Sequence, residues 1–383
     1  MDESRSRTPP TLASVAHLAG VSRQTVSNAV NNPELLRPET LARVQRVIAE
    51  VGYAPNRAAR NLRTRRAHLV GLQFEPGAEH TADALLDRFV HTLVDRSAEA
   101  GLHVLLFSGR GVAPEAREAA DRADRDGEHE PMAGHAELWR SGAVDAFIIT
   151  DTYRADVHGA WLSSQGAPFV AFGRPWDDID GADHPWVDVD GAAGTAMATR
   201  HLIERGHRRV AWLGQEPESL VTADRRSGWT AAMAESGLPT AGLELSAAPT
   251  VAGGREAAHR LLDEAERDPA QRADAVVAVS DTVAFGVLQA LHERGLRPGI
   301  DLAVTGFDDS QSAQLVPGGL TSVRQPLEQV AVELVDALGR LLGVDAATSS
   351  PGDPQAPDDE RTARPGPAAR LLAPQLVVRG SSG

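Results

Sequence analysis

Three side chains that can read DNA bases lie close together near the start of the chain: Arg23, Gln24 and Asn28. An arginine can donate two hydrogen bonds to guanine O6 and N7, and a glutamine or asparagine amide can pair with adenine N6 and N7 in the major groove. The alternative interpretation is that these residues form a solvated polar face of a helix. The elements around them distinguish base reading from this alternative.

Side chains suited to phosphate oxygens surround these three residues. Hydroxyl and amide groups that contact phosphates fix the register of a protein on DNA without reading its sequence. The candidates are Thr11, Ser22, Thr25, Ser27, Asn31 and Tyr53.

No pattern typical of an enzyme is found in the rest of the chain. It has no G-x-S-x-G nucleophile turn and no G-K-[ST] phosphate loop, and Gly109-Arg110-Gly111 lacks the third glycine of a dinucleotide fingerprint. His129 and His135 do not have H-E-x-x-H spacing, and Asp188-x-Asp190-Gly191 lacks the other ligands of a calcium loop. We therefore expect no catalytic residue, no metal site and no cofactor.

Two short helices position the candidate base readers. Thr11 is suited to cap a first helix, Gly20 to supply a tight turn, and Ser22 to cap a second helix whose Val26 and Val30 face inward. This spacing is typical of a helix-turn-helix DNA reader. A third helix is expected to begin at Pro38 and to bury an apolar face formed by Leu41, Val44, Ile48 and Val51.

A short arginine-rich segment, residues 56–66, follows this headpiece. A helix of about two turns is marginal alone in water, so it would fold fully only when something orders it. Leu62 lies between Arg60, Asn61 and Arg63, which is a poor context for an ordinary core residue.

Short apolar runs alternate with amphipathic helical stretches beyond residue 67. This alternation is typical of parallel sheets with helices on both faces, and its length suggests two such lobes. Strands are expected at 69–74, 103–107, 145–150, 168–172, 209–213, 275–279 and 302–306. Helices are expected at 82–100, 192–205, 225–236, 254–266 and 282–294.

Three segments depart from these patterns. Residues 1–10 are expected to form a disordered arm and the Pro-rich residues 345–368 a flexible loop. Residues 111–137 are charged and suggest an enlarged surface helix and loop.

Charge is distributed unevenly along the chain, whose net charge is −15. Residues 1–66 carry eleven arginines against five acidic residues, whereas the remainder carries 27 basic against 48 acidic residues. A basic arm on an acidic body attracts phosphates locally and repels DNA elsewhere. The chain contains no cysteine, and neither a signal peptide nor a membrane span is recognised in it, so we expect a cytoplasmic, nucleoid-associated protein without a membrane partner.

The chain resembles the lactose/galactose-repressor family along nearly its whole length. In the headpiece the matching stretches are A-G-V-S-R-Q-T-V-S (19–27), R-P-E-T (37–40), G-Y-A-P-N (52–56) and A-R-N-L (59–62). In the body they are F-G-R (172–174), D-V-D-G-A-A-G (188–194), H-L-I-E-R-G-H-R-R-V-A-W-L-G (201–214), R-R-S-G-W (225–229), S-D-T-V-A-F-G (280–286), V-T-G-F-D-D (304–309) and L-T-S-V-R-Q-P (320–326).

The resemblance implies base reading by the second helix and a minor-groove role for the arginine-rich segment. Paired hinge helices of this family enter the minor groove at the centre of a palindrome, where a leucine kinks the DNA. Carried onto this sequence, the hinge residues are Asn56, Ala59, Arg60 and Leu62.

The body is expected to be a bilobed α/β domain similar to periplasmic sugar-binding proteins. The family fold crosses between its lobes three times, here near Gly173, near Gln325 and before the last strand. This gives a headpiece at 11–55, a hinge at 56–66, a first lobe at 67–172 and 326–344, and a second lobe at 173–325 and 369–380.

The resemblance places an effector site between the lobes. Its candidate residues are Phe74, Glu75, Arg174, Arg225, Ser280, Asp308 and Gln325. Alternatives remain for several of them, because Arg174 and Asp308 could merely pair across the hinge and Arg225 could form a surface ion pair with Asp224. Ser280 stands where the family commonly has Asn, the residues after Phe74 lack an aromatic pair frequent in pentose binders, and Trp176 and Trp186 could stack on a ligand or simply pack.

These observations predict a homodimeric transcriptional regulator, acting as a repressor at a palindromic operator and controlled by a small sugar-like effector. A purine-like corepressor is one alternative. The other is a protein partner, acting through the 111–137 segment, with no small-molecule effector.

Overall fold

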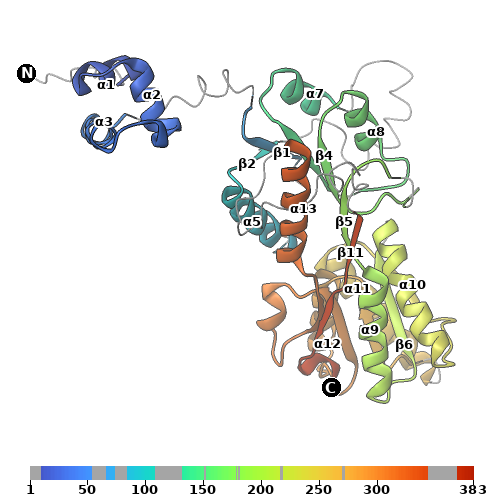
Figure 1. Cartoon of the computed structure of the whole chain (residues 1–383). Helices are drawn as coiled ribbons and strands as arrows, with labels where there is room; N and C mark the ends of the chain where they lie inside the picture. Colours follow the sequence, from blue (N-terminus) through green and yellow to red (C-terminus); the bar gives the residue numbers. More distant parts are fainter. Residues whose placement is uncertain are drawn as a thin grey trace, which may run out of the picture. The chain divides into compact units, whose positions relative to one another are not determined.

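The protein consists of two compact units, residues 1–67 and 68–383. The computed structural model describes residues 10–53, 66–73, 84–107, 132–150, 152–177, 179, 182–215, 219–269, 272–343 and 369–383. The predicted architecture, a small helical unit followed by an α/β body with two sheets, is confirmed (Figure 1).

The first unit is a bundle of three helices around a small aliphatic core. Thr11 caps α1 with a capping box, Gly20 turns the chain at φ +63°, and Ser22 caps α2 by accepting a hydrogen bond from the Thr25 amide. The buried core contains Val15, Ala16, Ala19, Val26, Ala29 and Val44. The elements are α1 (Leu12–Ala19), α2 (Arg23–Asn31), η1 (Pro33–Leu35) and α3 (Pro38–Val51).

The body contains two six-stranded sheets, which define its first and second lobes. All strands of the first sheet are parallel, and the second sheet is parallel except for its edge strand β12. The first sheet runs in the order β11 (Ala369–Leu372), β5 (Trp186–Val189), β4 (Phe169–Phe172), β3 (Ala146–Ile149), β1 (Leu69–Gln73) and β2 (His103–Phe107). The second sheet runs in the order β12 (Gln375–Val377), β10 (Thr321–Arg324), β9 (Ala303–Asp308), β8 (Ala275–Ala278), β6 (Val210–Gln215) and β7 (Glu244–Ala247).

Helices cover both faces of each sheet because successive strand residues point to opposite sides. In β3, Ala146 and Ile148 join the core beneath α5 and α13, whereas Phe147 and Ile149 join the core beneath α7 and α8. The first lobe contains α5 (Ala84–Glu99), α7 (Ala133–Arg140), α8 (Val157–Ser164) and α13 (Leu327–Leu342). The second lobe contains α9 (Gly191–Glu204), α10 (Leu220–Glu235), α11 (Val251–Arg267), α12 (Asp281–Glu293) and the 3-10 turns η3 (Gln311–Gln314) and η5 (Gly380–Ser382).

Two of the lobe boundaries predicted from the sequence are wrong. Strand β5 pairs with β4, so the first crossing lies at Asp190, after β5, and not near Gly173. Strand β11 pairs with β5 in the first sheet, so only the chain after Leu372 returns to the second lobe. Both strands are four residues long, and β-pairing to a distant strand leaves little local signal in so short a run.

Helix α10 also begins earlier than its predicted start at residue 225. Ser219 caps it by accepting a hydrogen bond from the Thr222 amide, so Arg225 lies in the second turn of the helix. Residues 1–9, 54–65, 108–131 and 344–368 lie outside the described residues. These undescribed ranges cover most of the predicted arm at 1–10, most of the predicted hinge, the predicted loop at 345–368 and the greater part of the charged segment at 111–137, whose residues 133–137 belong to α7.

The close packing of α10 on α9 gives a stability prediction. A Cβ at Gly228 would lie 2.0 Å from the Ala192 backbone oxygen, and neither backbone can yield cheaply. We expect Gly228→Ala to lower the free energy of unfolding by roughly 1–3 kcal/mol in urea titrations. Gly159 in α8 is the control, because its Cβ would meet Phe169 at an ordinary 3.6 Å. Gly159→Ala should leave stability unchanged or raise it, and equal losses in both variants would contradict the packing argument.

Candidate functional site

Helix α2 presents the three predicted base readers away from the core of the first unit. Arg23 and Gln24 are exposed and Asn28 is half-buried, whereas Val26 and Ala29 of the same helix are buried. The Gln24 Nε2 atom donates a hydrogen bond to Asn28 Oδ1 at 2.9 Å. This bond holds the two amides side by side on the exposed surface of the helix.

Three of the predicted phosphate contacts, Thr11, Ser22 and Thr25, lie at the starts of α1 and α2, where they also stabilise the fold. Thr11 and Ser22 are exposed caps, and the Ser22 hydroxyl lies 2.9 Å from that of Thr25. Tyr53 packs partly against the headpiece core, Ser27 is half-buried, and Asn31 ends α2. The predicted hinge residues Asn56, Ala59, Arg60 and Leu62 lie outside the described residues, as do Phe74 and Glu75 of the body.

In the second lobe of the body, the structure brings three of the predicted effector residues together. Asp308 ends β9 with φ +109°, a strained conformation for a residue with a side chain, and Asp309 follows with φ +47°. Gln325 donates a hydrogen bond to Asp308 Oδ1 at 2.8 Å, and the Arg225 guanidinium lies 3.6 Å from the same oxygen. Asp308 is therefore held from two sides.

Arg225 forms the base of this cluster. Its guanidinium carbon lies 3.7 Å from the centre of the Phe307 ring, and its Nη1 donates to the Val279 carbonyl at 2.7 Å. Burial lowers the pKa of Arg225, and the neighbouring Asp308 opposes that shift. The arginine is thus a buried cation that supports Asp308, and the alternative interpretation, a surface ion pair with Asp224, does not describe its main interaction.

Arg174 belongs to a separate cluster at the first crossing. Its Nε donates to Asp188 at 2.5 Å, its two terminal nitrogens each lie 3.4 Å from an oxygen of Asp224, and Nη2 also donates to the Val189 carbonyl at 3.2 Å. Asp188 is in the first lobe and Asp224 is in α10 of the second lobe. Arg174 therefore connects the two lobes through ion pairs. Burial raises the pKa of Asp224, and Arg174 opposes that shift.

The remaining predicted residues near the cleft have structural contacts. Ser280 caps α12 by accepting a hydrogen bond from the Val283 amide. The Trp176 ring lies 4.7 Å from the Arg174 guanidinium, and its indole donates to the Thr152 carbonyl at 3.1 Å. Trp186 is buried in the core of the first lobe, so it packs and does not line the cleft.

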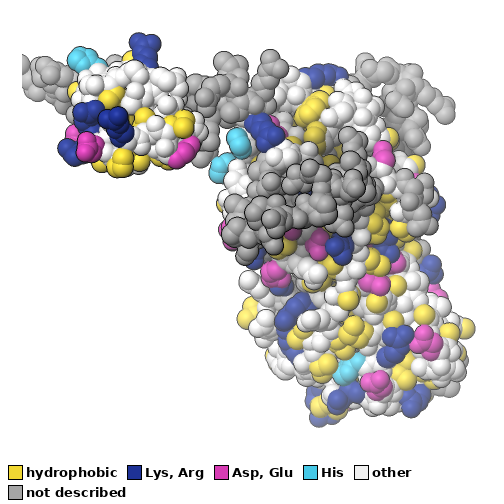
Figure 2. Space-filling model, in the orientation of Figure 1, with side chains coloured by type: hydrophobic (Ala, Val, Ile, Leu, Met, Phe, Trp, Pro, Cys, Tyr) yellow, Lys and Arg dark blue, Asp and Glu magenta, His cyan; other side chains and the backbone are white. Residues whose placement is uncertain are grey.

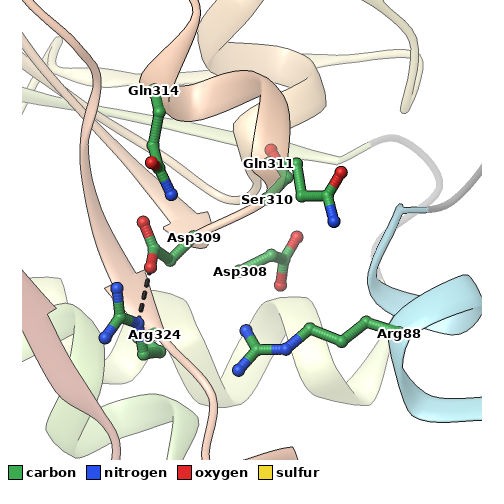
Figure 3. A pocket seen from close by; sticks show the side chains of 7 residues that line it. All are labelled: Arg88, Asp308, Asp309, Ser310, Gln311, Gln314 and Arg324. Atoms are coloured by element: carbon green, nitrogen blue, oxygen red, sulfur yellow. Dashed lines mark hydrogen bonds and ion pairs between the residues drawn. The ribbon is translucent and has the colours of Figure 1, made fainter. Parts of the chain in front are cut away.

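A polar cavity of about 340 Å³ lies on the other side of Asp308 (Figure 3). Most of its lining was not predicted from the sequence. It is lined by Arg88, Asp308, Asp309, Ser310, Gln311, Gln314 and Arg324. Its volume falls within the range of about 300–1,000 Å³ that is usual for small-molecule sites.

Paired charges hold the wall of this cavity. Arg324 Nε donates to Asp309 Oδ2 at 2.6 Å, and Arg379 Nη2 lies 2.6 Å from Asp309 Oδ1. Position at a strand end was the sequence signal that could have found Asp309 and Arg324, because carboxyl ends of parallel strands gather at one edge. No such signal marked Arg88, an arginine on an amphipathic helix, or the glutamines of η3.

Asp281, at the start of α12, fixes the loop behind this wall. It is buried, and it accepts hydrogen bonds from the Ser322 hydroxyl at 2.5 Å and the Ser310 amide at 2.7 Å. Burial raises the pKa of its carboxyl to about 6, despite these hydrogen bonds.

Within the described residues, no cluster of three or more His, Cys, Asp or Glu side chains could hold a metal ion. None of the helices described has both the length and the apolar character needed to cross a membrane. On the face of the molecule shown in Figure 2, arginine and acidic side chains are interspersed over the described surface.

Two family models match the chain. Residues 11–56 match the model of bacterial regulatory proteins of the lacI family, and residues 199–382 match the periplasmic binding protein-like domain. The HTH-type transcriptional regulator CelR of Thermobifida fusca is 33% identical over 359 residues, covering 91% of this chain and 95% of that one.

Solved structures of transcriptional regulators are also similar to most of this chain. A regulatory protein of the LacI family from Chloroflexus aggregans is 30% identical with a TM-score of 0.66, covering 83% of this chain and 99% of that one. A complex of the transcriptional regulator CelR with cellobiose is 28% identical with a TM-score of 0.64, covering 97% of this chain and 99% of that one.

The raised pKa of Asp281 predicts a pH dependence of stability. Because the folded-state pKa lies above the ordinary 3.8, its contribution is complete below about pH 4 and is lost as the pH rises through about 6. We expect the free energy of unfolding of the wild type, relative to Asp281→Asn, to fall by about 2 kcal/mol between pH 4 and pH 7.5.

Asp301→Asn is the control for this titration. Hydrogen bonds from Arg297 lower the pKa of Asp301, so its contribution is complete above the ordinary pKa and is lost as the pH falls. The difference in stability between the wild type and Asp301→Asn should therefore stay nearly constant between pH 4 and pH 7.5. Parallel pH curves for the two variants would show that burial of Asp281 has no such effect.

Proposed function

The chain belongs to the lacI family of bacterial regulatory proteins, and we propose that it is a repressor whose affinity for a palindromic operator is controlled by a sugar-like effector bound between its lobes. The family assignment confirms the resemblance seen in the sequence. It makes the chain a DNA-binding transcription regulator and not an enzyme.

The observation that carries the DNA-reading part of the proposal is the exposed surface of α2. Arg23, Gln24 and Asn28 offer one guanidinium and two amides from a single helix whose opposite face is buried. These groups match the base edges of G·C and A·T pairs in the major groove. The expected phosphate contacts at Thr11, Ser22, Thr25, Ser27, Asn31 and Tyr53 would set the register of the helix.

A two-fold dimer would place one α2 helix in each half of a palindrome. The segment at 56–66 would then form paired hinge helices, with Asn56, Ala59, Arg60 and Leu62 in the minor groove at the centre. A hinge of this length is marginal alone, so its helical state depends on its partner and on DNA. A change within the body can therefore alter operator affinity by a small displacement.

The effector part of the proposal is supported by the polar cavity and by the cluster beneath it. Asp308, with Arg225 and Gln325 behind it, faces a cavity rich in carboxylate, amide and guanidinium groups, which match adjacent hydroxyls. The related regulator CelR has been solved with cellobiose. Ligand binding would close the lobes by population shift and release the hinge helices.

Fluorescence anisotropy on palindromic DNA selected from a random pool tests the whole proposal. Tight, salt-sensitive binding that one mono- or disaccharide weakens is the expected result. Binding that no sugar changes would remove the sugar effector and favour a purine-like corepressor or a protein partner. Failure to enrich any palindrome would contradict the proposal that the protein binds a palindromic operator.

Variants of α2 separate base reading from phosphate contact. We expect Arg23→Ala and Asn28→Ala each to cost roughly 1–3 kcal/mol on the selected operator and to relax base choice at one half-site position. Thr25→Val, the control, should weaken binding equally on all sequences. If Arg23→Ala also weakens binding uniformly, Arg23 contacts the backbone and does not read a base.

A further inference from the structure

Among the described residues, most of those that line the cavity beside Asp308 belong to the second lobe. Six of these seven residues belong to β9, β10 and the η3 segment, and the seventh is Arg88 of α5 in the first lobe. Figure 3 shows the Arg88 side chain reaching from α5 toward Asp308, so a guanidinium of one lobe and a carboxylate of the other face the same space.

The position of Arg88 is fixed without burying it. One terminal nitrogen donates to Glu328 of α13 at 2.7 Å, and about a third of the arginine side chain stays exposed. Arg88 lowers the pKa of Glu328 through this hydrogen bond, so the pair is ionised near neutral pH. Since α5 and α13 pack together in the first lobe, this contact directs the guanidinium from a rigid pair of helices.

Each charged side chain that lines the cavity already has a partner of opposite charge. Asp309 is paired with Arg324 and Arg379, Asp308 with Arg225, and Arg88 with Glu328. An anionic ligand would therefore have to displace an internal carboxylate. An uncharged ligand with adjacent hydroxyls has no such cost, because one hydroxyl can donate to Asp308 and its neighbour can accept from Arg88.

We propose that Arg88 is an effector-binding residue of the first lobe, and that it bridges an uncharged polyhydroxy ligand to Asp308 of the second lobe. This inference rests on the proposed sugar-responsive function. A ligand held in this way contacts both lobes, so its binding favours whichever arrangement brings Arg88 and Asp308 to the right separation. Glu328 is a positioning residue that orients the guanidinium.

A purely structural role for Arg88 is the alternative. In that case the arginine only ties α5 to α13, and breaking the ion pair from either side should have the same consequence. If Arg88 binds the ligand, removal of its guanidinium is far more damaging than neutralisation of Glu328, because Glu328→Gln breaks the ion pair but leaves the guanidinium in place to bind the ligand.

The test is calorimetry on the full-length protein with cellobiose, maltose, galactose and ribose, followed by titration of the variants with whichever sugar binds the wild type. Arg88→Gln should weaken binding at least tenfold, Arg88→Lys should weaken it less, and Glu328→Gln should stay within about threefold of the wild type. Arg96→Gln is the matched control, because Arg96 lies on α5, pairs with Glu99 at 2.8 Å and does not line the cavity. Operator binding without sugar should be unchanged in all four variants.

The possible outcomes separate this inference from the proposed function. Sugar binding that is equal in the wild type and in Arg88→Gln overturns the role of Arg88 and leaves the sugar-responsive regulator standing. Equal losses in Arg88→Gln and Glu328→Gln would show a structural ion pair and also overturn it. A wild type that binds the selected operator but none of the four sugars overturns both the role of Arg88 and the proposed control by a sugar. Stronger binding of glucuronate than of the neutral sugars would contradict the proposal that the ligand is uncharged.

Discussion

The buried guanidinium of Arg225 is the interaction on which the arrangement of the cleft depends. A buried cation is costly unless it is paired and hydrogen-bonded. Arg225 is stabilised by three groups: the aromatic ring of Phe307 in β9, the carbonyl of Val279 after β8, and the carboxylate of Asp308 at the end of β9. These contacts tie α10 to the carboxyl ends of two neighbouring strands and set the direction in which Asp308 points.

The same principle recurs at the other charged groups of the cleft. Asp309 is buried between Arg324 and Arg379, which links β10 and the end of the chain to the wall of the cavity. Arg174 joins Asp188 of the first lobe to Asp224 of the second at the first crossing. Because the Arg174 pairs join groups of both lobes, a displacement of one lobe changes how well these charges are neutralised. Such networks are suited to having two discrete arrangements, which is what a conformational switch requires.

The first unit has a different physical character. Its core consists of a few alanine and valine side chains on three short helices, with caps at Thr11 and Ser22 that also lie at the surface expected to meet DNA. Small cores of this kind provide limited stability, so contacts made with a partner contribute a larger share of the total.

The sequence by itself determined the features that depend on local pattern. Caps at Thr11 and Ser22, the turn at Gly20 and the exposed positions of Arg23 and Gln24 follow from neighbouring residues, and the resemblance brought Arg225, Asp308 and Gln325 to one site. Tertiary structure alone decided which sheet takes β5 and β11, because a four-residue strand chooses its partner through distant pairing. It also decided that Arg174 pairs with carboxylates of both lobes and that Arg88 and Asp308 line one cavity, since these arrangements bring together residues of separate elements and lobes through packing that no local pattern encodes.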